Sequence, residues 1–367
     1  MNAPPKFDMT EATRLTRAGR LKEAMAVLRG ALPGASPSEH TAGGMQKQVP
    51  AVLRGLLDRM RQPGRAHGLD GLGGLAAPGP RPAPLPDGAT FDQRHYANAA
   101  GSRIYKLYVP SRYQGQAVPL VVMLHGCTQS PDDFAAGTRM NELAEEQNFL
   151  VAYPAQPQSA NVSKCWNWFN VGDQQRDGGE PALIAGITRQ IMRDFNVAPG
   201  RVYVAGLSAG GAAAAIMGAT YPDLYAAIGV HSGLACGAAR DMPSAFTAMR
   251  QGAPAAARTR RDGAGGIPTI VFHGDRDTTV NPVNADQVIA QAKAAAEFST
   301  TVSGGESAGG IRYTRSVQSD ASGRPMLEQW VLHGTGHAWS GGSAAGSYTD
   351  PRGPDASREM LRFFLQH

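Results

Sequence analysis

Several uninterrupted apolar segments, separated by amphipathic ones, restrict most strongly what this chain can fold into. The apolar segments are residues 119–126, 149–154, 201–206, 226–232 and 268–274. Helical patterns lie between them, over residues 131–147, 180–195 and 209–220, and an alternating strand pattern precedes them at 103–110. Strands that are apolar throughout are typical of parallel sheets covered by helices on both faces. We therefore expect an α/β fold with a mainly parallel sheet and with reactive groups at the carboxyl ends of its strands.

A stretch rich in glycine and proline divides the chain into two parts. Residues 63–88 contain seven Gly and six Pro in twenty-six positions, a density that sustains neither helix nor sheet, so we interpret them as a linker. Before it, residues 1–62 show short amphipathic helical patterns, including an A-G-R-L-x-E-A segment similar to half of a tetratricopeptide repeat. We expect a helical leader over 1–62 and the main domain over 89–367.

The region before residue 89 also contains the net charge of the chain. Residues 1–88 hold 12 Lys and Arg against 7 Asp and Glu, which accounts for the whole formal charge of +5. A basic leader of this kind is either a solvated segment or a surface that attaches to something anionic or amphiphilic. Basic residues are not interleaved with aromatic ones, so we expect no nucleic-acid partner.

The sequence predicts a cytoplasmic protein. Charged residues interrupt the first 25 positions, so they do not resemble a secretion signal, and no stretch approaches the roughly 18–20 apolar residues of a membrane span. Cys127, Cys165 and Cys236 are too few for a disulfide framework, and we expect three free thiols. Export without a recognisable signal and a bridge between Cys165 and Cys236 remain open alternatives.

Residues 206–210 form the pattern G-L-S-A-G between a predicted strand and a predicted helix. This is the context of a nucleophile elbow, in which a serine lies on a tight and strained turn. The flanking glycines allow the strand and the helix to approach closely. We therefore expect Ser208 to act as a nucleophile.

A serine hydroxyl needs a general base, which a third group orients. Asp275 and Asp277 follow one predicted strand, and His333 and His337 follow a later apolar segment. His337 lies in a glycine-flanked loop from which an imidazole could reach the serine, whereas His333 and His273 lie at strand ends and are expected to be structural. Of the two aspartates we favour Asp277, because it lies farther from the tight turn at the strand end.

An acyl-transfer site also needs two backbone N–H groups aimed at the negative charge that develops on the carbonyl oxygen. One N–H group is expected from Ala209, directly after the serine. The other is expected from the loop H-G-C-T-Q at residues 125–129, where Cys127 would act through its backbone N–H and not through its thiol.

Five motifs closely resemble those of the poly(3-hydroxybutyrate) depolymerase-like esterases with a type I catalytic domain, which are related to feruloyl and acetylxylan esterases. The motifs are, in order, L-H-G-C-T-Q, C-W-N-W-F, G-L-S-A-G-G, H-G-D-R-D-T-T-V and G-T-G-H-A-W. The resemblance covers about residues 90–365. It implies an α/β-hydrolase fold, a triad of Ser208, Asp277 and His337, and oxyanion donors at Cys127 and Ala209.

The same resemblance also indicates which residues would contact the substrate. It implies that Trp339, two residues after the catalytic histidine, lines the acyl groove. Trp166 and Gln129 are further candidate substrate contacts, although Trp166, like Trp168, could equally belong to the core. No metal or organic cofactor is expected.

The resemblance predicts a serine esterase that acts on poly(3-hydroxybutyrate)-type polyesters or their oligomers. A feruloyl or acetylxylan esterase is the nearest alternative, and a non-catalytic granule-associated protein is the alternative from another class. Secreted depolymerases have a signal peptide and a separate substrate-binding domain, and this sequence shows neither. We therefore expect action on storage granules or soluble oligomers, with residues 1–62 as a candidate docking segment for the granule surface.

Overall fold

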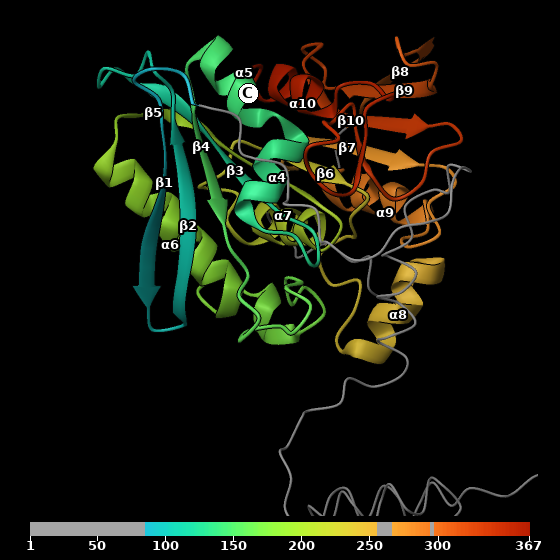
Figure 1. The fold of residues 1–367 in the computed structure, drawn as a ribbon. Coiled ribbons are helices and arrows are strands. Elements are labelled where there is room, and N and C mark those ends of the chain that lie inside the picture. The colour runs from blue at the N-terminus through green and yellow to red at the C-terminus, as the bar shows by residue number, and fades with distance from the viewer. Residues whose placement is uncertain (1–84, 255–265, 294–296) are drawn as a thin grey trace, which may run out of the picture. The chain divides into compact units, whose positions relative to one another are not determined.

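The computed structural model describes residues 85–254, 266–293 and 297–367, and its centre is a ten-stranded sheet (Figure 1). The strand order is β1-β2-β4-β3-β5-β6-β7-β10-β9-β8. The strands are β1 (Thr90–Asn98), β2 (Gly101–Val109), β3 (Val118–Leu124), β4 (Leu150–Pro154), β5 (Val197–Leu207), β6 (Ala227–His231), β7 (Thr269–Gly274), β8 (Ser299–Glu306), β9 (Arg312–Ser319) and β10 (Pro325–Leu332). Two short strands, β11 (Trp339–Ser340) and β12 (Thr349–Asp350), form a separate parallel pair.

The central strands of the large sheet run parallel, as the sequence predicts. β4, β3, β5, β6, β7 and β10 are each parallel to their neighbours in this series. β1 and β2 extend one side of the series in antiparallel pairing, and β9 and β8 extend the other side in the same way. Parallel neighbours need long crossover connections, which the helices supply.

Helices cover both faces of the sheet (Figure 1). They are α4 (Pro131–Thr138), α5 (Met140–Gln147), the 3-10 helix η1 (Val171–Gln174), α6 (Gly179–Asp194), α7 (Ala209–Thr220), α8 (Met242–Gln251), α9 (Val283–Ala292) and α10 (Ala356–Phe364). Along β3, Leu120, Val122 and Leu124 pack into the core that contains α6, α7 and α9. Val121 and Met123 point to the other core, with α4, α5 and α10. Because β3 is buried on both faces, its sequence is apolar at every position.

The predicted elements differ from the observed ones mainly at one helix. The helix predicted over 131–147 is divided into α4 and α5 at Arg139, whose φ of 55° lies in the left-handed region and ends the first helix. The helix predicted over 209–220 has the bounds of α7. The five predicted apolar segments all form strands of the central sheet.

The predicted leader over 1–62 lies outside the described residues, as does the linker over 63–88 except for its last four positions. The first described strand begins at Thr90, one residue after the predicted start of the main domain. In the part of the chain that the structure describes, no helix has both the length and the apolar character that crossing a membrane requires.

Candidate active site

Four parallel strands end side by side and bring the predicted site residues to one edge of the sheet. In the ladder, Leu207 pairs with His231, and His231 pairs with Phe272. One strand further, Gly274 pairs with Leu332. The loops that follow β5, β7 and β10 contain Ser208, Asp277 and His337, respectively. Side chains at the carboxyl ends of neighbouring parallel strands can act together, which is the usual position of sites in open α/β sheets.

Ser208 lies on a strained turn between β5 and α7. Its φ of 58° and ψ of −118° are sparsely populated by residues other than glycine, a conformation that costs on the order of 1–3 kcal/mol. The surrounding structure holds it there, since the Ser208 N–H donates to the His231 carbonyl at 2.9 Å. Within the described residues, the Ser208 hydroxyl makes no hydrogen bond. Contacts between a catalytic base and its nucleophile often form only when substrate is bound.

The two glycines of the G-x-S-x-G pattern are required by close backbone packing around this turn. A Cβ at Gly206 would overlap the carbonyl oxygen of Gly210, and a Cβ at Gly210 would overlap the carbonyl oxygen of Leu124 at the end of β3. No side chain, however flexible, can occupy these positions without moving backbone. The glycines therefore bring Ser208 beside the loop that follows β3.

Two His–Asp pairs lie between the loops after β7 and β10, and they have different environments. His337 Nδ1 lies 2.6 Å from Asp277 Oδ2, and the Asp277 side chain has no exposed surface. His333 Nδ1 lies 3.0 Å from Asp275 Oδ2, with about a third of each side chain exposed. His333 Nε2 is occupied by the Thr314 hydroxyl at 2.9 Å. The buried pair consists of Asp277 and His337, the two residues that the sequence analysis favours.

The carboxylate of Asp277 stays ionised although it is buried. Burial alone would raise its pKa, but His337 and His273 outweigh that effect and hold the pKa of Asp277 well below its usual value. Its other oxygen, Oδ1, accepts hydrogen bonds from the N–H groups of Thr279 and Val280 at 2.8 and 2.9 Å. A fixed carboxylate of this kind selects the His337 tautomer that has its hydrogen on Nδ1, and so leaves Nε2 able to accept a proton.

The loop after β3 is held rigidly beside the serine turn. The Gly126 N–H donates to Gln129 Oε1 at 2.9 Å, and His125 Nδ1 donates to the Gly126 carbonyl at 2.8 Å. Burial lowers the pKa of His125 to about 4, so its neutral Nε2 accepts the Gln156 N–H at 3.1 Å. Within the described residues, the N–H groups of Cys127 and Ala209 donate no hydrogen bond, which leaves both predicted oxyanion donors unoccupied.

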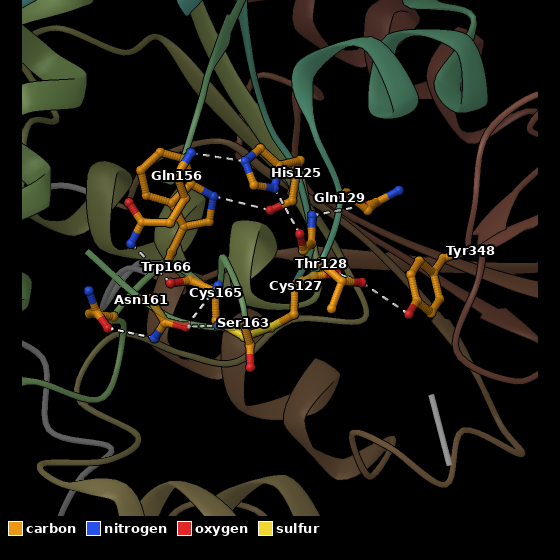
Figure 2. The surroundings of a disulfide bond; sticks show 12 residues. His125, Cys127, Thr128, Gln129, Gln156, Asn161, Ser163, Cys165, Trp166 and Tyr348 are labelled. Carbon is orange, nitrogen blue, oxygen red and sulfur yellow. Dashed lines mark hydrogen bonds between the residues drawn. A yellow bond between two sulfur atoms is a disulfide. The ribbon is translucent and has the colours of Figure 1, made fainter. Parts of the chain in front are cut away.

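A disulfide joins Cys127 to Cys165, with their Cα atoms 4.2 Å apart (Figure 2). The expectation of three free thiols was therefore wrong, and so was the alternative bridge between Cys165 and Cys236; Cys236 is not part of a disulfide. The Thr128 N–H also donates to the Ser163 carbonyl at 2.7 Å. The segment that contains Cys165 thus returns to the loop after β3 and fixes it by a covalent bond and a hydrogen bond.

The three candidate substrate contacts, Trp166, Gln129 and Trp339, are buried side chains. Trp166 has no exposed surface, and its indole N–H donates to the His125 carbonyl at 3.1 Å (Figure 2). Gln129 is 3% exposed, and its amide binds Asp133 and Ser347. Trp339 is fully buried, where it stacks on His231 with ring centroids 5.1 Å apart and donates to Ser357 Oγ. In this structure these side chains pack against the loops of the site and have little or no exposed surface.

Two buried ionisable residues were not identified by sequence reasoning. His231 Nε2 accepts the Ser340 N–H at 3.0 Å, just beyond His337, and burial holds the pKa of His231 well below its usual value. Glu180 accepts two hydrogen bonds from Asn167 at 2.7 Å, and burial raises its pKa to about 7. A histidine at the end of an apolar strand was the available signal for His231, whereas nothing local distinguishes Glu180 from a surface residue.

The fold and this arrangement of loops define an esterase-type α/β-hydrolase. Residues 103–318 match the family model described as esterase PHB depolymerase, and since the match spans more than half of the chain, the chain belongs to that family. It is thereby a member of a family of carboxylic ester hydrolases.

Individual relatives agree with this family. Over 249 residues the chain is 36% identical to poly(3-hydroxyalkanoate) depolymerase C of Paucimonas lemoignei. The aligned region covers 65% of this chain and 59% of the depolymerase. Feruloyl esterase B of Neurospora crassa is 28% identical over 285 residues, covering 73% of this chain and 89% of the esterase. The solved structure of an acetyl xylan esterase from Aspergillus awamori superposes with a TM-score of 0.59 at 20% identity, covering 76% of this chain and all of that chain, and shows the same fold.

Proposed function

We propose that this chain is a serine esterase that hydrolyses ester bonds of poly(3-hydroxybutyrate)-type polyesters or their oligomers. Ser208 is the nucleophile, His337 the general base and Asp277 the residue that orients it. The observation that supports this most directly is the buried Asp277–His337 pair at 2.6 Å, at the same sheet edge as the strained turn of Ser208. A fixed carboxylate, an imidazole and a half-buried serine hydroxyl on a tight turn are the parts that acyl transfer requires.

The reaction would proceed in two steps. Ser208 Oγ attacks the ester carbonyl carbon while His337 Nε2 takes the hydroxyl proton, and the N–H groups of Cys127 and Ala209 donate to the resulting oxyanion. The intermediate collapses as His337 returns the proton to the leaving alcohol, which leaves an acyl group on Ser208. Water then attacks the acyl group with His337 again as base, and the acid is released.

The polyester substrate is the finer part of the proposal. It is supported by the identity with the Paucimonas lemoignei depolymerase, although the chain spans only about three-fifths of the length of that relative. A feruloyl or acetylxylan esterase is the second candidate, because the chain covers 89% of the Neurospora crassa feruloyl esterase. The intact Ser, Asp and His positions argue against a non-catalytic granule protein.

The basic leader suggests how the chain would reach a polymer. All of the net charge of +5 lies within residues 1–88, and we propose that residues 1–62 dock on the anionic, amphiphilic surface of storage granules. Such binding should weaken as salt screens the charges. Deleting residues 1–84 should therefore reduce hydrolysis of amorphous granules and leave hydrolysis of a small soluble ester unchanged. Equal loss on both substrates would contradict docking.

A substrate panel tests the proposed activity. Purified protein and Ser208→Ala would be assayed on 3-hydroxybutyrate oligomers, amorphous poly(3-hydroxybutyrate), p-nitrophenyl esters and methyl ferulate. Removing the nucleophile should lower the rate by several orders of magnitude and leave the thermal midpoint nearly unchanged. Retention of a tenth of the activity by Ser208→Ala would exclude Ser208. Higher kcat/KM for methyl ferulate than for the oligomers would favour the feruloyl esterase alternative.

A further inference from the structure

His273, near the end of β7, shares the carboxylate of Asp277 with His337. The His273 side chain is 2% exposed, and its Nε2 lies 2.9 Å from the Val280 carbonyl oxygen and 3.3 Å from Asp277 Oδ2. A carbonyl oxygen can only accept a hydrogen bond, so Nε2 carries a hydrogen. The same nitrogen thus donates to the Val280 carbonyl and lies close to the Asp277 carboxylate.

Two imidazole nitrogens therefore lie close to the same oxygen of Asp277. His337 Nδ1 donates to Oδ2 at 2.6 Å, and His273 Nε2 approaches Oδ2 at 3.3 Å. The backbone N–H groups of Thr279 and Val280 occupy Oδ1. With both oxygens bound, the carboxylate cannot rotate, and any donor that withdraws charge from Oδ2 makes it a weaker acceptor for His337.

Packing alone does not explain an imidazole at position 273. His273 Nδ1 is buried and has no hydrogen-bond partner within the described residues. An unpaired polar atom in a core costs free energy that an apolar side chain of similar size would avoid. The useful part of the side chain is thus the Nε2–H group. A further titratable side chain near this cluster is His231, whose pKa burial holds well below its usual value.

We propose that His273 is a positioning residue for the esterase reaction: its Nε2–H group fixes Asp277 Oδ2 and moderates how strongly this oxygen stabilises protonated His337. This inference rests on the proposed function. If Oδ2 lost the His273 donor, it would hold the protonated imidazole more tightly. His337 would then stay protonated at higher pH, where it cannot act as a base.

Three substitutions separate this role from a merely structural one. His273→Gln can place an amide N–H group near the position of Nε2, whereas His273→Asn is too short to do so and His273→Leu has no donor. His333→Leu is the matched control, because His333 pairs with the exposed Asp275. Each variant would be measured for kcat and KM on a soluble p-nitrophenyl ester, for the pH profile of kcat/KM, and for its thermal midpoint.

We expect His273→Leu and His273→Asn to lower kcat by about tenfold with little change in KM, because the triad is less well oriented. The acid limb of the kcat/KM profile should move up by about half to one pH unit in both, which is the size of one hydrogen bond. His273→Gln should restore both properties, and His333→Leu should change the rate by less than about fivefold and leave the acid limb in place.

The proposal is overturned if the acid limb is unmoved in both His273→Leu and His273→Asn, or if His273→Gln behaves like them. If His273→Leu fails to fold, His273→Asn gives the same comparison with a polar side chain. Failure of the proposed function has a different signature, since Ser208→Ala would then keep its activity. Normal loss in Ser208→Ala with unchanged His273 variants would refute the positioning role alone.

Discussion

Replacing Asp277 by asparagine should disable the site by reversing a single hydrogen bond. Oδ1 of Asp277 accepts two backbone N–H groups, from Thr279 and Val280, so the asparagine oxygen must occupy that position. Its NH2 group would then face His337 Nδ1 at the present distance of 2.6 Å. An N–H donor there favours the tautomer with hydrogen on Nε2, and this nitrogen could no longer accept a proton from Ser208.

The size of the effect follows from the environment of each aspartate. Loss of the correct tautomer in a Ser–His–Asp triad lowers kcat by about 10⁴, which corresponds to roughly 5 kcal/mol of the activation free energy. Asp275 pairs with His333 where 38% of the Asp275 side chain and 36% of the His333 side chain are exposed. Exposed ion pairs contribute about 0–1 kcal/mol, so Asp275→Asn should change the rate by less than about fivefold.

The assay is steady-state hydrolysis of a p-nitrophenyl ester by the two variants, with circular dichroism and the thermal midpoint as folding controls. We expect Asp277→Asn to reduce kcat far more than KM and to remain folded. Asp275→Asn should resemble the wild-type protein. A larger loss in Asp275→Asn than in Asp277→Asn would show that the wrong His–Asp pair has been assigned to the reaction.

Three more predictions follow from particular contacts. Denatured, unreduced protein should show one titratable thiol, since Cys127 and Cys165 are joined, and three thiols would contradict the structure. Reduction of this disulfide by a dithiol should lower kcat by about tenfold, because the loop that contains the Cys127 N–H group would no longer be fixed. Gly210→Ala should destabilise the protein by about 1–3 kcal/mol, and an unchanged unfolding free energy would refute the close contact with the β3 end. Burial, together with Asp173, raises the pKa of Glu180 from 4.5 to about 7, so the folded state keeps a proton that the unfolded state loses. The stabilisation by Glu180 is thus complete below about pH 4.5 and is lost as pH rises to about 7; Glu180→Gln should flatten this part of a plot of unfolding free energy against pH.

The central sheet and the serine turn could be predicted because their signals are local. A strand buried on both faces, such as β3, must be apolar at every position, and the glycines beside Ser208 are required by contacts within a few residues of the turn and with one neighbouring strand. The aspartate and histidine of the site follow strand ends, so their position at one edge could be inferred from the parallel order. β8 gave no such signal, because seven of its eight residues are exposed.

The disulfide and the burial of Trp339 could not be predicted in this way. Cys127 and Cys165 are 38 residues apart, and their proximity depends on how the loop after β4 folds back over the sheet edge. Trp339 follows His337 closely, which suggested a place in the groove. Its orientation is set by distant partners, since its ring packs on Phe134 and its indole N–H binds Ser357.

The bond between Cys127 and Cys165 has a consequence for where the protein can work. Structural disulfides persist in oxidising compartments such as the periplasm or the cell exterior, and they are rare in the cytoplasm. The disulfide and the sequence-based expectation of a cytoplasmic protein therefore indicate different compartments. If Cys127 N–H serves the reaction as proposed, a reducing cytoplasm would keep newly made chains poorly active, and passage into an oxidising environment would activate them without any proteolytic step.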